Sequence, residues 1–235
     1  MIYVVLCDTA RLNTELCSPL VSLYGVGQMI DGASSRTRRR TAAYLALGEI
    51  YELLAREEGR PEKFPPISRD LVGKPYFTTA GVSFPCFSIS YDNDTVCIAL
   101  SDTDTDVGVD IERKRECREK EKIEKRLTVE IDESLSFLDG NEVKYFLAVQ
   151  GEGGRIERLD RVPNEILRRV NGQKRSTGED FFFRWTLTEA ILKADGGGFF
   201  SVESREKIKK GMRVEAVSFK YLSDDVYLSV AIKNR

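Results

Sequence analysis

The chain contains no histidine at all. This absence excludes Ser-His-Asp and Cys-His catalysis, zinc sites built on imidazole, and imidazole general acids. If the protein is an enzyme, its chemistry depends on carboxylates, lysine, arginine, hydroxyl groups or a metal ion bound by oxygen. The sequence also lacks any run of about 18 apolar residues, and we therefore expect no membrane-spanning helix.

Charge of one sign is not in excess either. The formal net charge is −2, although 31% of the 235 residues are charged. No global field attracts nucleic acid or an anionic membrane, so any binding of phosphate must be local. The basic run at 36–40 has no interleaved aromatic residues, which favours the phosphates of a small ligand over nucleic acid.

Cysteine is scarce, and its spacing indicates no paired site. The five cysteines include no Cys-x-x-Cys pair, which argues against a disulfide framework or a zinc knuckle. We expect small buried apolar side chains in a reducing compartment at Cys7, Cys17, Cys86, Cys97 and Cys117. The apolar run at 1–7 has no basic leader and no cleavage site, so it predicts a strand, and we expect a cytoplasmic protein.

Apolar periodicity predicts helices at 41–56 and at about 186–194. β-like runs predict strands at 2–6, 107–111, 213–221 and 226–232, and a hairpin over 82–100. One helix and several strands thus occur in each half of the chain. We predict an α+β fold of two similar subdomains, residues 1–105 and 106–235, in which each helix packs on an antiparallel sheet.

The middle of the chain has weaker patterns. Residues 113–126 are dense in lysine, arginine and glutamate, and they predict a solvated helix face. A strand, an Asp-Gly-Asn turn at 139–141 and a second strand predict a hairpin over 134–149. The polar stretch at 151–180 predicts no element.

Two carboxylates and a glycine share one face of the strand predicted at 107–111. Alternation places Gly108, Asp110 and Glu112 on the face opposite the valines and the isoleucine. Like charges on one face repel unless a cation lies between them, and the glycine leaves room for a ligand to approach. The alternative is an exposed polar face at a strand end.

Two further charged positions have both an ordinary and a functional interpretation. Glu189 and Lys193 are four residues apart and lie on one face of a predicted helix, where they form either a surface ion pair or part of a site. Lys74 precedes Pro75, which favours an extended backbone with the side chain directed outward. It is either a solvated turn residue or a ligand contact.

Five short motifs in a fixed order resemble the Sfp-type 4′-phosphopantetheinyl transferases. They are Arg40-Thr41 at a helix start, Gly73-Lys-Pro75, Phe87-Ser-Ile-Ser90, Gly108-Val-Asp-Ile-Glu112, and Trp185-Thr-Leu-Thr-Glu-Ala190 followed by Lys193. The last two are the specific ones. The resemblance implies the fused form of that family, with two subdomains related by a pseudo-twofold axis.

The resemblance also implies a reaction and roles for individual residues. Asp110, Glu112 and Glu189 would bind Mg²⁺ together with the diphosphate of coenzyme A. The phosphates of coenzyme A would be contacted by Arg36, Arg40, Lys74, Ser90 and Lys193. The catalytic residues would be Asp110, Glu189 and Lys193: a carrier-protein serine attacks the β-phosphate, 3′,5′-ADP leaves, and the proton passes to Glu189 or to a metal-bound water.

The chain departs from the family pattern at two places. Tyr91 stands where relatives usually have histidine, so one phosphate contact changes to a neutral hydroxyl. The stretch at 113–181 is longer than in relatives, where this region helps to dock the carrier protein, and it is either an altered docking surface or an insert. The resemblance implies an acyl or peptidyl carrier protein as partner and a monomeric enzyme. The alternatives are a non-catalytic module that binds coenzyme A or a carrier protein, and a different Mg²⁺-dependent diphosphate enzyme.

Overall fold

The computed structural model describes residues 1–12, 35–71, 73–116, 121, 124, 136–169, 177–196 and 211–234. The two long helices are α2 (Ser35–Glu57) and α4 (Thr177–Asp195), and η1 (Thr9–Arg11) and η3 (Asn164–Ile166) are short 3₁₀ helices. The strands are β1 (Ile2–Asp8), β2 (Ile67–Arg69), β3 (Pro75–Phe77), β4 (Cys86–Asp92), β5 (Thr95–Ser101), β6 (Thr105–Arg113), β7 (Ser136–Phe137), β8 (Val143–Gln150), β9 (Ile156–Arg161), β10 (Arg168–Arg169), β11 (Met212–Tyr221) and β12 (Asp224–Asn234).

Most of these strands form two sheets. The first has the order β4-β5-β1-β8-β9, and the second has the order β10-β11-β12-β6 with the short β7 beside β11. Neighbouring strands are antiparallel except for two parallel pairs, β1 with β8 and β7 with β11. The described residues thus form a mixed α and β fold whose sheets are not purely antiparallel, contrary to the prediction.

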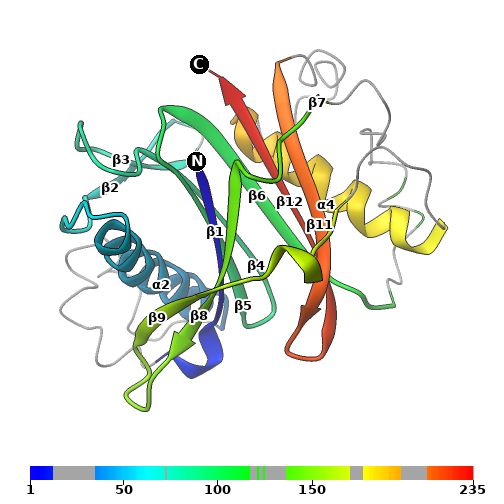
Figure 1. The fold of residues 1–235 in the computed structure, drawn as a ribbon, viewed down its shortest axis with the longest axis horizontal. Coiled ribbons are helices and arrows are strands. Elements are labelled where there is room, and N and C mark those ends of the chain that lie inside the picture. The colour runs from blue at the N-terminus through cyan, green and yellow to red at the C-terminus, as the bar shows by residue number, and fades with distance from the viewer. Residues whose placement is uncertain are drawn as a thin grey trace.

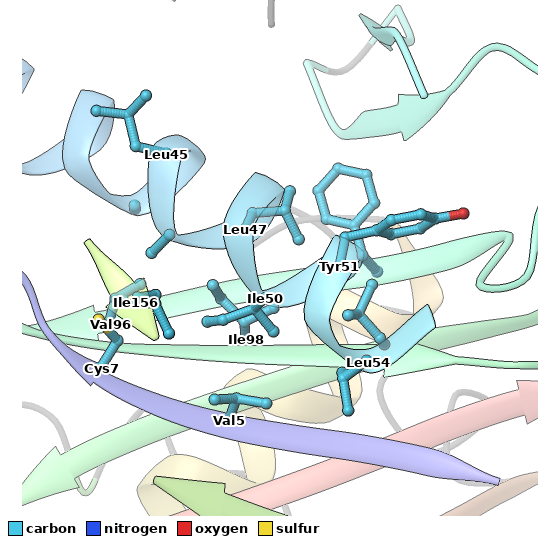
Figure 2. Close-up of a cluster of buried hydrophobic side chains, with 14 of the residues drawn as sticks. Val5, Cys7, Leu45, Leu47, Ile50, Tyr51, Leu54, Val96, Ile98 and Ile156 are labelled. Carbon is cyan, nitrogen blue, oxygen red and sulfur yellow. The ribbon is translucent and has the colours of Figure 1, made fainter. Parts of the chain in front are cut away.

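The helices lie on the outer faces of the two sheets (Figure 1). α2 covers one face of the first sheet, where its Ile50 and Leu54 pack on Val5 and Ile98 (Figure 2). Alternate residues of β1, such as Val4 and Leu6, point away from α2 into a second core shared by both sheets. This layering follows from strand alternation, because each sheet has two apolar faces to cover.

The core between the sheets also contains a buried polar bridge. Glu215 on β11 is 4% exposed, and it accepts hydrogen bonds from the Tyr145 hydroxyl at 2.5 Å and from Arg169 Nε at 2.8 Å. Tyr145 belongs to β8 in the first sheet, so the bridge joins the two sheets. A buried carboxylate with two donors avoids the cost of an unpaired charge.

Several predicted elements are confirmed. β4 and β5 form the antiparallel hairpin predicted over 82–100, and β11 and β12 pair along their whole lengths. Both helices are longer than predicted, since α2 begins at Ser35 and α4 at Thr177. Cys7, Cys86 and Cys97 are buried as predicted and form no disulfide among the described residues, whereas Cys17 and Cys117 lie outside them.

The hairpin predicted over 134–149 is wrong. The turn exists, with the Asn141 amide donating to Oδ1 of Asp139 at 3.1 Å. The strands on its two sides do not pair, because β7 joins β11 and β8 joins β1. A turn signal fixes the local backbone, but the partner of a strand depends on distant residues.

The expected insert at 113–181 contains strands of the first sheet. β8 pairs with β1, and β9, which the sequence did not predict, pairs with β8. The chain therefore returns to the first sheet after β6 has entered the second one. The division of the chain at residues 105 and 106 stays a prediction, and the solvated helix at 113–126 lies mostly outside the described residues.

Gly108 on β6 faces α4, not a ligand as the sequence suggested. A Cβ atom at this position would lie on the carbonyl oxygen of Ala190 and 2.5 Å from the amide nitrogen of Ala194. The missing side chain therefore lets helix backbone and strand backbone approach closely. Among the described helices, none is long and apolar enough to cross a membrane.

Gly108→Ala should destabilise the protein by at least about 2 kcal/mol, because the added methyl group meets backbone atoms that cannot rotate away. Urea unfolding monitored by circular dichroism measures the change. Gly153→Ala is the matched control, since a Cβ atom there meets nothing within 4 Å. Equal stability of the two variants would contradict the close contact.

Candidate functional site

Side chains of β4 connect the first sheet to the free edge of β6. Ser88 Oγ accepts from the amide of Val109 at 3.1 Å, and Oδ2 of Asp92 accepts from the amide of Arg113 at 2.9 Å. An unpaired edge amide that is buried needs an acceptor, and here side-chain oxygens take the place of a backbone ladder. This seam between β4 and β6 fixes the strand that carries Asp110.

Asp110 lies at the centre of the site and is 5% exposed. Its Oδ1 accepts from Ser90 Oγ on β4 at 2.7 Å and from Lys193 Nζ on α4 at 2.7 Å. Lys193 also donates to the carbonyl oxygen of Val109 at 3.0 Å. Oδ2 of Asp110 is buried and has no hydrogen-bond partner among the described residues. Two donors thus hold Oδ1 of Asp110, whereas Oδ2 is a buried acceptor without a donor among the described residues.

Glu112 follows Asp110 on the same face of β6 and pairs with Arg115. Nη2 of Arg115 lies 2.8 Å from Oε2 of Glu112, whose side chain is 12% exposed. Burial raises the pKa of Glu112 to about 8; Arg115 opposes the rise, whereas Asp110 and Asp92 add to it. The ionised form of Glu112 is therefore disfavoured unless more positive charge is near.

Glu189 lies one helical turn before Lys193 on α4 and is half-buried. Burial raises its pKa to about 7, repulsion from Asp110 adds to the rise, and Lys193 opposes it. Lys193 pairs with Asp110 across the two elements. The ordinary interpretation, an exposed pair between Glu189 and Lys193, does not describe this helix face.

Lys74 lies at a separate part of the site, beside a cavity of about 340 Å³ between the two halves of the fold. Its Nζ lies 3.4 Å from the carbonyl oxygen of Ala194 near the end of α4 and 3.8 Å from Oδ1 of Asp106. The turn before it requires Gly73, whose φ is +88°. The cavity is lined by Asp70, Lys74, Pro75, Tyr76, Pro85, Cys86, Phe87, Asp106, Val107, Asp195 and Gly196.

Two other predicted ligand contacts, Tyr91 and Arg40, make no hydrogen bond or ion pair with Asp110 in the described part of the chain, and the third, Arg36, is only partly described. Tyr91 is 43% exposed, and strand alternation places it on the face of β4 opposite Ser90. Arg40 is half-buried in α2, and Arg36 lies in the first turn of that helix, where its side chain is outside the described part. The structure thus gathers Ser90, Asp110 and Lys193, whereas Tyr91 lies on the other face of β4 and Arg40 on another element.

The donor set at Asp110 suits a hard divalent cation. All candidate ligands are carboxylate oxygens, and Oδ2 of Asp110 is buried without a hydrogen-bond donor. In the conformation that the structure describes, no three acidic or cysteine side chains converge on one point as a complete metal shell does. Glu112 and Glu189 would have to rotate toward Asp110. The residues therefore fit Mg²⁺ in chemical type and in position along their elements.

Sequence reasoning missed two site residues, Asp92 and Arg115. Asp92 is 7% exposed and accepts from Nη1 of Arg115 at 2.8 Å. A signal existed, because Ser88, Ser90 and Asp92 form a polar stripe with the two-residue period of a strand. Arg115 lies two residues beyond the end of β6, and no local pattern marks it.

Comparisons with known proteins leave the family open. A search against profiles of protein families finds no match to this chain. A search of curated proteins finds no match either.

The raised pKa values predict how the metal-free protein responds to pH. Glu112 and Glu189 bind a proton more tightly in the folded protein than in the unfolded chain, whose glutamate pKa is about 4.3. The two protonated side chains contribute their full stabilisation of the folded protein below about pH 4.3. This contribution is lost as the pH rises through about 7 to 8. We expect Tm in EDTA to fall by several degrees between pH 5 and pH 8.5.

Differential scanning calorimetry of the wild type, Glu112→Gln and Glu189→Gln checks this expectation. Each variant should flatten the fall, because glutamine does not titrate. A wild-type Tm that is constant or rises across this range would contradict it.

Proposed function

We propose that this protein transfers the 4′-phosphopantetheine group of coenzyme A to a serine of an acyl or peptidyl carrier protein in a Mg²⁺-dependent reaction. The observation that supports this most is the convergence of Ser90, Asp110 and Lys193. They come from β4, β6 and α4, and both contacts to Asp110 measure 2.7 Å. The three residues belong to three of the motifs that resemble the Sfp-type transferases.

The arrangement of the elements is compatible with the two-subdomain fold of that family. α2 lies on the first sheet and α4 on the second, and the site lies where β4 meets β6 (Figure 1). We propose that these two helix-on-sheet units correspond to the two subdomains related by a pseudo-twofold axis. The insertion of β8 and β9 into the first sheet then belongs to the connection between them.

Coenzyme A is a long substrate with a nucleotide at one end and a diphosphate near its middle. The cavity beside Lys74 has a volume of about 340 Å³. This volume lies within the range of small-ligand pockets and accommodates part of such a molecule. Pro75 and Phe87 offer apolar walls for a flat ring, and Lys74 offers a charge for a phosphate. Asp106 and Val107 of β6 line this cavity, and Asp110 lies further along the same strand.

The side chains of the proposed site have different roles in phosphoryl transfer. When bound, Mg²⁺ neutralises the diphosphate and the charge that develops on the leaving 3′,5′-ADP. The carrier serine forms a bond to the β-phosphorus as the bond from that phosphorus to the ADP oxygen breaks. Lys193 stabilises the transferred phosphoryl group, and Glu189 takes the serine proton. Ser90 holds Oδ1 of Asp110, so that Oδ2 would remain available to hold the ion.

Intact-mass analysis of an apo carrier protein after incubation with this protein, coenzyme A and Mg²⁺ tests the function. We expect the gain of one phosphopantetheine group, lost in EDTA. Asp110→Asn and Glu189→Gln should slow transfer by at least about 100-fold, because each removes a charge or a proton acceptor at the reacting groups.

Asp160→Asn is the matched control for that experiment. Asp160 lies on β9, its side chain is 52% exposed, and it pairs with Arg158. Its loss should leave the rate unchanged. If no carrier protein gains mass while coenzyme A still raises Tm, the proposed reaction is wrong and the protein is a binding module.

The binding module is the second candidate function, and one feature favours it. The carboxylates Asp110 and Glu112 are already paired with Lys193 and Arg115, as in a site that has stopped binding metal. Such a module would bind coenzyme A equally well in Mg²⁺ and in EDTA. Titration calorimetry under the two conditions separates it from the enzyme.

Tyr91→His should leave the KM for coenzyme A unchanged, because residue 91 lies on the face of β4 opposite Ser90. Steady-state kinetics at varied coenzyme A concentration measures the KM, and kcat should stay near the wild-type value. A clearly lower KM would mean that an imidazole at residue 91 reaches a phosphate of the substrate.

A further inference from the structure

Arg115 connects three elements at the edge of the site. Its Nη1 lies 2.8 Å from each carboxylate oxygen of Asp92 at the end of β4, and its Nη2 lies 2.8 Å from Glu112 on β6. Its guanidinium carbon lies 5.9 Å from the centre of the Trp185 ring on α4. A planar guanidinium with five donors can hold two carboxylates and still contact an aromatic ring.

The two carboxylates need this cation. Asp92 is 7% exposed, and the side chain of Glu112 is 12% exposed. Both are therefore removed from most of the water that would screen their charge, and they repel each other and Asp110. Arg115 is the cation that contacts both of them, and its own side chain is 42% exposed. Its own charge can therefore move toward solvent, but Asp92 and Glu112 then need another cation.

Glu112 cannot pair with Arg115 and bind a divalent cation at the same time. An ion between Asp110 and Glu112 would have to draw the Glu112 carboxylate away from the guanidinium, and it would lie close to that positive charge. At short range and low effective dielectric, two such cations repel strongly. Lys193 causes no such conflict at Asp110, because it contacts Oδ1 and leaves Oδ2.

We propose that Arg115 is a positioning residue that holds Glu112 in the metal-free protein and is exchanged for a divalent cation when the site is loaded. Arg115 thereby weakens metal binding while it stabilises the metal-free fold. The inference rests on the proposed function, because it takes Glu112 as a metal ligand.

Mg²⁺ titrations monitored by the rise in Tm, with no substrate present, test the proposal. Arg115→Gln should bind Mg²⁺ about 3- to 10-fold more tightly than the wild type, because the competing charge is gone. The same variant should have a lower Tm in EDTA, because Asp92 and Glu112 lose their cation. A residue with a purely structural role would lower the Tm without any gain in affinity.

Two further variants make the test specific. Arg113→Gln is the matched control: it removes the same charge from the same strand end, but Arg113 contacts Thr95 and Asp224 and not Glu112. Its Mg²⁺ affinity should change by less than about 2-fold. In a Glu112→Gln background, Arg115→Gln should no longer tighten binding, because Arg115 acts through Glu112.

The remaining outcomes are decisive as well. Unchanged or weaker Mg²⁺ binding by Arg115→Gln overturns the proposal and leaves the proposed function intact. If Arg115→Gln does not fold, Arg115→Lys is used in its place. That variant keeps one cation for Asp92 but cannot hold both carboxylates, and it should tighten binding by about 2- to 3-fold. If no protein in the series responds to Mg²⁺, the proposed function fails together with the inference.

Discussion

The close contact between α4 and β6 at Gly108 is the constraint on which the rest of the site depends. Helix backbone at Ala190 and Ala194 lies directly against the strand, because residue 108 has no side chain to keep them apart. Two residues further along β6, Asp110 therefore comes within reach of Lys193. A longer side chain at residue 108 would move the helix outward and separate a carboxylate from a cation that are 83 residues apart in sequence.

The first sheet contributes to the same site through polar side chains, not through apolar packing alone. Ser88 and Asp92 hold the edge amides of β6, and between them Ser90 holds Asp110. On the far side of the shared core, the contact between Tyr145 and Glu215 joins the sheets a second time. The position of Asp110 thus depends on both sheets and on α4 at once.

The sequence predicted elements whose signal is local. α2, the β4–β5 hairpin and the strands β11 and β12 have clear apolar periodicity or tight turns, and all were found. β8 was assigned to the wrong partner, because its pairing with β1 depends on residues about 140 positions away. β9 was missed, because it is polar apart from Ile156 and Leu159. At the site, motif resemblance selected Asp110, Glu112, Glu189 and Lys193, whereas Arg115 has its role only through contacts that the fold creates.

At the seam between β4 and β6, side-chain hydrogen bonds connect the two sheets in place of a backbone ladder. A ladder of backbone hydrogen bonds is the same whatever the amino acids are, so substitution cannot easily loosen it. Here three short side chains, those of Ser88, Ser90 and Asp92, make the connection. A single codon change can replace any one of them. Evolution can therefore adjust how strongly the two sheets are held together one residue at a time. The backbone hydrogen bonds within each sheet stay unchanged.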